Sequence, residues 1–386
     1  MPTRRHILEL LTAAPALAAC SPSDLPDPVA AWRTPGAGET DARRHALAHA
    51  ILAPNPHNMQ PWLIDLVGAD QIALFIDPAR LLPVTDPPNR QITIGCGAFL
   101  ELLDIAAREN GHRAEIVAFP DGEPQPVLDA RPVARITLTK DASVAKDPIY
   151  SAITARRTNR EQYDPARIPI DDDLRAVVMA VADGTFDAVN GNPKLVTAFV
   201  SDAPTVAKMR DIVWRGWARE MATPAANKES VDVMRIGAAE IARHRDGLVL
   251  EGPAIEAMHA VGLLNRKALL DPKSEANKQG AAIWKNLADT APAFIWITGA
   301  DNTRTTQLAA GRAYARMNLE ATARGLAMHP WSMALQEYPE MADLYAEQQA
   351  MLGGMPAAPV QMLARIGYGK TVKPAPRRGL AGHIRA

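Results

Sequence analysis

Residues 55–62 read Asn-Pro-His-Asn-Met-Gln-Pro-Trp and follow an Ala-Pro pair at 53–54. The stretch lies between a segment with helical spacing and a segment predicted as a strand, a junction from which a polar side chain can point into a cleft. Its prolines and tryptophan restrict the backbone around Asn58. An amide both donates and accepts hydrogen bonds, so Asn58 can satisfy the edge of a flat heterocycle such as a flavin ring.

The spacing of apolar residues predicts alternating helices and strands on both sides of this loop. The predicted elements are a helix over 41–52, strands over 62–67 and 72–76, a helix over 97–110 that ends at Gly111, and strands over 114–119 and 133–139. A second long helix is predicted over 311–324 and ends at Gly325.

The two long helices share a spacing of glycines. Gly97 precedes Gly111 by 14 positions, and Gly311 precedes Gly325 by the same 14. We interpret each first glycine as a small residue at a helix start that permits close packing, and the shared spacing as a sign of internal duplication. Chance similarity between two buried helices is the alternative.

Between about residues 203 and 287 the pattern is almost wholly helical and includes Trp214 and Trp217. This stretch is either an insertion that covers a cleft or a structural bundle, and the sequence does not separate the two interpretations.

Three arginines fall within five residues, at Arg156, Arg157 and Arg160. Guanidinium groups this close repel one another unless an anion or several carboxylates compensate them, and each matches the fork of a phosphate. With the hydroxyl of Thr158, the cluster suits a phosphoester and a ribityl chain. A solvated run of surface charge is the alternative.

These motifs together resemble the nitroreductase superfamily. The loop at 53–62 is similar to its A-P-S-x-x-N-x-Q-P-W motif, the segment 156–160 to its R-R-S-x-R motif with threonine for serine, and the segments 325–332 and 366–380 to its flavin loop and closing basic segment. The resemblance implies bound FMN. The residues that it implies as FMN contacts are Asn58, Gln60, Arg156, Arg157, Thr158, Arg160, His329, Pro330, Trp331, Ser332, Arg377 and Arg378.

In a single superfamily unit the arginine motif precedes the N-x-Q-P-W loop, whereas here it follows the loop. Fusion of two units explains this order, because members dimerise with FMN at the shared interface. The R-R-T-N-R sequence is most similar to the Acg-like fused branch. We therefore expect an α+β fold with two tandem nitroreductase-like units in an intramolecular pseudo-dimer, antiparallel-rich sheets flanked by helices, and one FMN. The first unit is expected over 41–145 and the second over 146–386, with the insertion at 203–287.

The N-terminus reads as an export signal over residues 1–20. Arg4 and Arg5 match a twin-arginine signal, and Leu-Ala-Ala-Cys at 17–20 matches a lipobox in which Cys20 would be acylated. Cleavage after Ala18 without acylation is the alternative. Residues 21–40 would then be a flexible tether. We expect export to the periplasm or cell envelope, with membrane contact only through the lipid anchor.

The composition restricts the possible partners. A formal net charge of −1 without a basic stripe argues against nucleic acid. No zinc or serine-hydrolase motif occurs, so we expect no metal, and Cys96 reads as a buried structural thiol.

The resemblance implies an FMN oxidoreductase that passes hydride or electrons through flavin N5 to a small conjugated or nitroaromatic molecule. Its reductant would be a membrane quinol or a partner protein, because the envelope is poor in nicotinamide. A protein that sequesters FMN without turnover is the alternative, and a purely structural protein without a cofactor is a third. No residue has an assignable acid or base role, and His57 is expected to pack in the loop rather than donate a proton.

Overall fold

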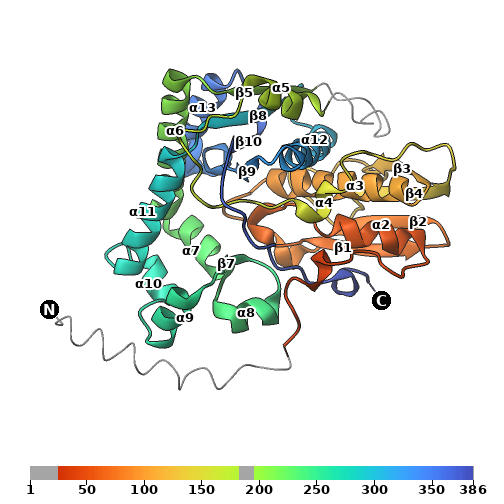
Figure 1. Cartoon of the computed structure of the whole chain (residues 1–386), viewed down its shortest axis with the longest axis horizontal. Helices are drawn as coiled ribbons and strands as arrows, with labels where there is room; N and C mark the ends of the chain where they lie inside the picture. The colour runs from red at the N-terminus through yellow and green to blue at the C-terminus, as the bar shows by residue number, and fades with distance from the viewer. Residues whose placement is uncertain (1–24, 182–194, 386) are drawn as a thin grey trace.

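The computed structural model describes residues 25–181 and 195–385 (Figure 1). The predicted signal, with Arg4, Arg5 and Cys20, lies outside the described residues. Two four-stranded antiparallel sheets, each with its own long helix, form the framework of the molecule.

The first sheet has the strand order β1-β2-β4-β3, and all of its pairings are antiparallel. Its elements are α2 (Ala42–Ala50), β1 (Trp62–Val67), β2 (Gln71–Ile76), α3 (Arg90–Glu109), β3 (His112–Ala118) and β4 (Ala134–Lys140). The strands agree with the predicted ones to within two residues at each end. Asp41 caps α2 by accepting a hydrogen bond from the backbone N–H of Arg43 at 2.9 Å.

The second sheet repeats this plan. Its elements are α5 (Asp171–Met179), β5 (Leu195–Val200), β8 (Ala293–Gly299), α12 (Arg304–Ala323), β9 (Ala327–Pro330) and β10 (Val360–Gly367). The strand order is β5-β8-β10-β9, again antiparallel throughout, and α12 joins β8 to β9 just as α3 joins β2 to β3. The order and the pairings match strand for strand, so the predicted duplication is confirmed.

The second unit differs from the first by an insertion between β5 and β8. It contains α6 (Ala203–Ala222), α7 (Pro224–Asp232), β6 (Met234–Ile236), α8 (Gly237–His244), β7 (Leu248–Leu250), α9 (Pro253–Ala260), α10 (Arg266–Leu270) and α11 (Glu275–Asp289). The prediction of an almost wholly helical stretch missed the short parallel pair of β6 and β7. In Figure 1 the insertion forms the side of the molecule away from the first sheet.

The remaining elements are short apart from one helix near the C-terminus. They are α4 (Ala152–Ala155), α13 (Ala342–Met351), and the 3-10 turns η2 (Ala30–Trp32), η3 (Pro56–Asn58), η4 (Pro78–Arg80), η6 (Met333–Leu335), η7 (Pro339–Met341) and η8 (Leu380–Gly382). Within residues 25–181 and 195–385, no helix has the length and apolar character needed to cross a membrane.

The long helices α3 and α12 cross where their glycines meet. A Cβ added to Gly97 would lie 2.0 Å from the carbonyl oxygen of Leu308, and one added to Gly311 would lie 1.9 Å from that of Ile94. The prediction that these glycines begin their helices was wrong, because α3 starts at Arg90 and α12 at Arg304. The glycines instead lie inside the helices, where the missing side chains let the two backbones touch.

A buried ion network lies beside this crossing. Glu101 of α3 accepts from Arg312 at 2.6 Å and from Arg316 at 2.9 Å, both on α12. Asp104 lies 3.0 Å from Arg312, and Asp147 lies 2.8 Å from Arg316. Mutual charge and hydrogen bonding compensate the cost of taking these ions out of water.

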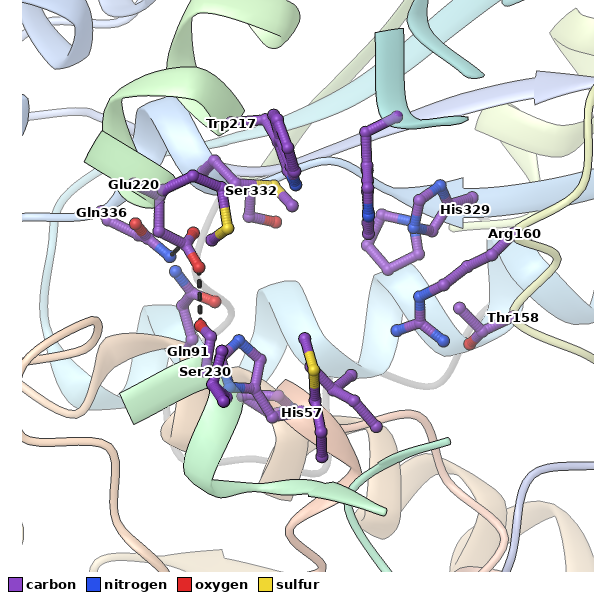
Figure 2. A pocket seen from close by; sticks show the side chains of 18 of the residues that line it. His57, Gln91, Thr158, Arg160, Trp217, Glu220, Ser230, His329, Ser332 and Gln336 are labelled. Carbon is purple, nitrogen blue, oxygen red and sulfur yellow. Dashed lines mark hydrogen bonds between the residues drawn. The ribbon is translucent and has the colours of Figure 1, made fainter. Parts of the chain in front are cut away.

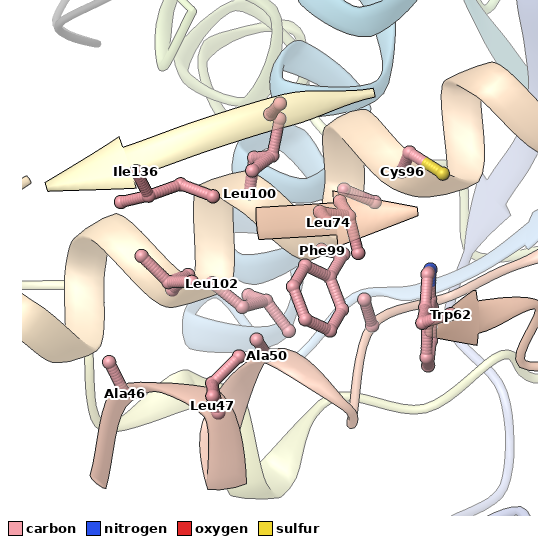
Figure 3. Packing of buried hydrophobic residues seen from close by; sticks show 14 of the residues in the cluster. Ala46, Leu47, Ala50, Trp62, Leu74, Cys96, Phe99, Leu100, Leu102 and Ile136 are labelled. Carbon is pink, nitrogen blue, oxygen red and sulfur yellow. The ribbon is translucent and has the colours of Figure 1, made fainter. Parts of the chain in front are cut away.

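The apolar core of the first unit lies between α3 and its sheet. Figure 3 shows Phe99 and Leu102 of α3 facing α2, with Leu74 of β2 and Trp62 of β1 nearby. The thiol of Cys96 is free and buried, as predicted. Leu308 and Leu319 of α12 belong to the same buried cluster, so the core continues from one unit into the other.

The C-terminal segment returns from the second unit to the first. Ile384 pairs in parallel with Ile64 of β1, and the backbone N–H of Ile64 donates to His383 at 2.9 Å. The chain's last residues therefore complete the edge of its first sheet.

The crossing predicts that Gly97→Ala lowers the free energy of unfolding by about 3 kcal/mol or more, because the added methyl group meets backbone rather than a movable side chain. Urea unfolding measures the change. The control is Gly280→Ala in α11, where an added Cβ meets nothing within 4 Å. There we expect unchanged stability or a gain of up to about 1 kcal/mol. Equal effects at both positions would contradict the close approach.

Candidate functional site

A cavity lies where the two units and the insertion meet. It encloses about 1430 Å³ of free space, including the part open to solvent. Its walls come from the loop at 54–57, α3, the segment after α4, the insertion elements α6, α7, β6, β7, α10 and α11, and from α12, β9, the chain that follows β9, and β10. Figure 2 shows ten of the residues around the cavity by name.

One end of the cavity carries Thr158 and Arg160 from the arginine segment. Arg160 is the one arginine or lysine in the described lining, and no carboxylate of the described chain pairs with it. Its side chain is open to the cavity but surrounded by protein atoms, and this burial lowers the pKa of the guanidinium, with Tyr314 and Tyr163 acting in the opposite direction. The result is an uncompensated positive charge that suits an anion.

Arg156 is buried and is not part of the cavity lining, and its guanidinium is only partly satisfied. Its Nη2 donates to the carbonyl oxygen of Leu52 at 3.0 Å, while Nε and Nη1 are buried and have no hydrogen-bond partner among the described residues. Burial lowers the pKa of Arg156 to about 10. A buried cation with two free donors is costly unless an anion lies within reach.

Arg156 belongs to a group of three guanidiniums around one indole. The distance from the guanidinium carbon to the ring centroid of Trp32 is 5.5 Å for Arg156, 4.9 Å for Arg157 and 5.1 Å for Arg377. Arg157 donates to the backbone carbonyls of Thr154 and Arg156 at 2.7 Å each. Cation–π contacts and backbone carbonyls, rather than carboxylates, hold these charges.

Asn58 and Gln60 do not line this cavity. Asn58 donates through Nδ2 to the carbonyl of Pro376 at 3.1 Å and accepts through Oδ1 from Arg377 at 2.6 Å. Gln60 is fully buried and accepts through Oε1 from the backbone N–H of Arg378 at 3.0 Å. Both residues have positive φ, +55° for Asn58 and +51° for Gln60, which turns the loop so that its residues 54–57 face the cavity instead.

The two predicted tail cations also contact backbone. Arg377 is buried and donates to the carbonyl oxygens of Ile51, Leu52 and Ala53 at 2.9 to 3.1 Å. Arg378 donates through Nη2 to the carbonyl of Gln60 at 2.9 Å. These bonds fasten the C-terminal segment to the loop that precedes β1.

The end of β9 and the chain after it supply predicted site residues to the cavity. His329, Pro330 and Ser332 line it. Trp331 is fully buried, and its indole N–H donates to the carbonyl of Val213 at 2.9 Å. The structure thus brings Thr158, Arg160, His329, Pro330 and Ser332 together in one cavity and places the other seven predicted residues outside its lining.

The sequence left open whether the insertion covers a cleft, and the structure shows that it lines this cavity, but its individual lining residues were not predicted. Trp217 and Glu220 of α6, Asn227 and Ser230 of α7 and Trp284 of α11 line the cavity. The helical pattern with its tryptophans was visible, but periodicity alone does not tell which partner a helix face covers.

The two histidines of the lining are held neutral. Burial, followed by the charge of Arg160, lowers the pKa of His57 to about 4. Burial, followed by Arg365 and Arg160, lowers the pKa of His329 well below its ordinary value. At neutral pH both rings are therefore uncharged.

This electrostatic arrangement predicts that Arg160→Gln raises the pKa of His57, because removing a nearby cation favours the protonated ring. The pKa should stay below 6.5, since burial is the larger cause. Proton NMR of the imidazole over a pH series measures it, with Arg113→Gln on the exposed face of β3 as the control. A His57 that titrates near 6.5 in the unsubstituted protein would contradict the described environment.

Comparison with known proteins was made at three levels. No family model matches the chain. Rv3131 of Mycobacterium tuberculosis H37Rv, whose name provisionally assigns it as an NAD(P)H nitroreductase, is 27% identical over 354 residues, covering 89% of this chain and 91% of that protein. The protein acg of the same organism, named likewise, is 37% identical over 83 residues, 21% of this chain and 24% of its own length.

Among solved structures, the FMN-dependent nitroreductase NfnB of Mycobacterium smegmatis, in complex with NADPH, superposes with a TM-score of 0.37 at 20% identity. It covers 61% of this chain and 96% of its own. That superposition is too loose to place a residue, whereas the sequence match to Rv3131 covers 89% of this chain. The chain is therefore related, over most of its length, to proteins that carry the nitroreductase name.

Proposed function

We propose that the protein is an FMN-dependent oxidoreductase of the nitroreductase type that holds one FMN in the cavity between its two units. The observation that carries the proposal is the entry of an arginine segment without carboxylate partners into a cavity to which both units contribute. The names of the sequence relatives support the same activity.

The residues present fit a phosphate-bearing flavin. Arg156 has two unpartnered donors, and Arg160 presents its fork to the cavity beside the hydroxyl of Thr158. Such groups bind a phosphoester and hydroxyls of a ribityl chain with charge-assisted hydrogen bonds. The chain at 329–332 would border the ring, and Asn58, Gln60, Arg377 and Arg378 would hold the backbone of the adjoining loop in place.

When bound, FMN would supply hydride and electron transfer between a reductant and a small acceptor. The protein would orient the acceptor and exclude water. Trp217 and Trp284 both line the cavity and stack on each other, with 5.8 Å between ring centroids and 18° between planes, so they give the cavity an aromatic wall. A conjugated or nitroaromatic acceptor matches such a wall.

Storage of FMN without turnover is the second candidate function. Residues of α6, α7, α10 and α11 line the cavity, so the insertion covers space that an acceptor would need. Anaerobic titration of the purified protein with NADPH, NADH and a quinol, followed by addition of a nitroaromatic, distinguishes the two. If one of the electron donors reduces the bound flavin and the nitroaromatic then reoxidises it, the result supports an enzyme. If no combination of donor and acceptor does so, the result supports storage of FMN.

The FMN site predicts that the purified protein is yellow and shows the visible absorption of oxidised flavin. Arg160→Gln and Arg156→Met should each weaken FMN binding by about tenfold or more, because each removes a charge-assisted contact of about 1.5 kcal/mol or more. Titration of the stripped protein with FMN measures the affinity. Arg113→Gln is the matched control, since Arg113 is exposed and pairs with Asp141. A colourless protein that takes up no FMN would refute the proposal.

We also propose that the protein is exported by the twin-arginine route and anchored through an acylated Cys20. Fractionated cells should then contain it with the membranes, and Cys20→Ser should move it to the soluble envelope fraction. The control is Cys96→Ser, which alters a buried thiol and should leave the location unchanged. If the Cys20→Ser variant is found with the membranes to the same extent as the unsubstituted protein, the lipid anchor is excluded.

A further inference from the structure

The end of the cavity opposite Arg160 is built mainly by the insertion. Glu220 lies on α6, Asn227 and Ser230 lie on α7, and Gln336 follows η6. Figure 2 shows Glu220, Ser230 and Gln336 together on one side of the cavity and Arg160 on the other. The cavity thus has two chemically different ends.

Glu220 is the one acidic side chain in the described lining, and it is 3% exposed. It accepts from the hydroxyl of Ser230 at 2.7 Å and from the side-chain amide of Gln336 at 2.9 Å. Within the described chain no lysine or arginine pairs with it, and burial raises the pKa of the carboxyl group. A carboxylate has about four acceptor sites, so two neutral donors leave capacity for a ligand.

Two further acceptors at this end have no partner. The side-chain oxygens Oδ1 of Asn227 and Oε1 of Gln336 are buried and make no hydrogen bond within the described chain. Each side chain is 5% exposed and lines the cavity. Unsatisfied buried acceptors are rare in folded proteins, so at a cavity wall they can receive hydrogen bonds from a bound water or from a ligand that displaces it.

The aromatic wall adds a shape requirement. Trp217 is one turn from Glu220 on α6, and Trp284 stacks on it from α11. An aromatic ligand that packs against these indoles would lie within about one helical turn of the carboxylate of Glu220. A nitro or carboxylate group facing that carboxylate would bring only acceptors and would be repelled, so the end selects against it.

We propose that this end of the cavity is a subsite for an aromatic molecule that carries an amino or hydroxyl group, which donates to Glu220, Asn227 and Gln336 while its ring packs against the stacked indoles of Trp217 and Trp284. This subsite rests on the proposed function, because the aromatic molecule is taken to be the substrate that exchanges electrons with FMN. Its amino or hydroxyl group, a hydrogen-bond donor, is the end of the substrate that the insertion recognises.

Calorimetric titration of the FMN-loaded protein with 2-naphthol and with 2-methoxynaphthalene tests the subsite. The two probes share a ring system and differ in the O–H donor. We expect 2-naphthol to bind at least tenfold more tightly, and Glu220→Gln to reduce that ratio to threefold or less. The matched control Glu340→Gln changes an exposed glutamate outside the cavity and should preserve the ratio. Equal affinity for the two probes in the unsubstituted protein would overturn the subsite.

Asn227→Leu provides a second variant, because Glu220→Gln disturbs two existing hydrogen bonds. Removing an unpartnered oxygen should leave the unfolding midpoint unchanged or higher, while the preference for 2-naphthol falls. A lower unfolding midpoint with an unchanged preference would identify Asn227 as a structural residue and overturn its part in the subsite.

Flavin absorbance is recorded for every variant, so the two proposals fail separately. If the unsubstituted protein binds no flavin, the FMN site is refuted, and the preference for 2-naphthol is then measured without FMN. Retained flavin with no probe preference refutes only the subsite.

Discussion

The contact between the backbones of α3 and α12 is the constraint on which the rest of the structure depends. Because Gly97 and Gly311 lack side chains, the two helices approach until the carbonyl groups of one face the Cα atoms of the other. This distance sets how the two sheets sit relative to each other. The cavity takes one wall from each unit, so its width follows from the same contact.

Charge is distributed unevenly around this contact. Beside the crossing, Glu101 and Asp104 compensate Arg312 and Arg316, and the result is a closed, buried network. Near the cavity, Arg156 and Arg160 have no such carboxylates. Cations that the fold itself neutralises serve packing, whereas cations left uncompensated beside a cavity are available to a ligand. The same chain thus uses buried arginine in two physically different ways.

Much of the fold could be predicted from the sequence, because its signals were local. Short runs of apolar residues indicated β1 and β2, and the equal spacing from Gly97 to Gly111 and from Gly311 to Gly325 indicated the duplication. The helix starts were misplaced, since a glycine in a helix reads as a boundary until its packing partner is known.

The site was predicted only in part. Thr158 and Arg160 reach the cavity, but left-handed backbone at Asn58 turns its amide toward the C-terminal segment, and no local pattern reveals that partner more than 300 positions away. The contribution of Glu220 and Asn227 is likewise a property of tertiary packing.

The path of the C-terminal segment affects how the protein can be made. Ile384 lies against Ile64, and Arg377 holds the carbonyls of residues 51–53. The first unit therefore lacks this edge partner until residues 377–385 have been synthesised. Folding of that unit cannot be completed in step with its own synthesis, and separate expression of the two units would leave each with an exposed seam.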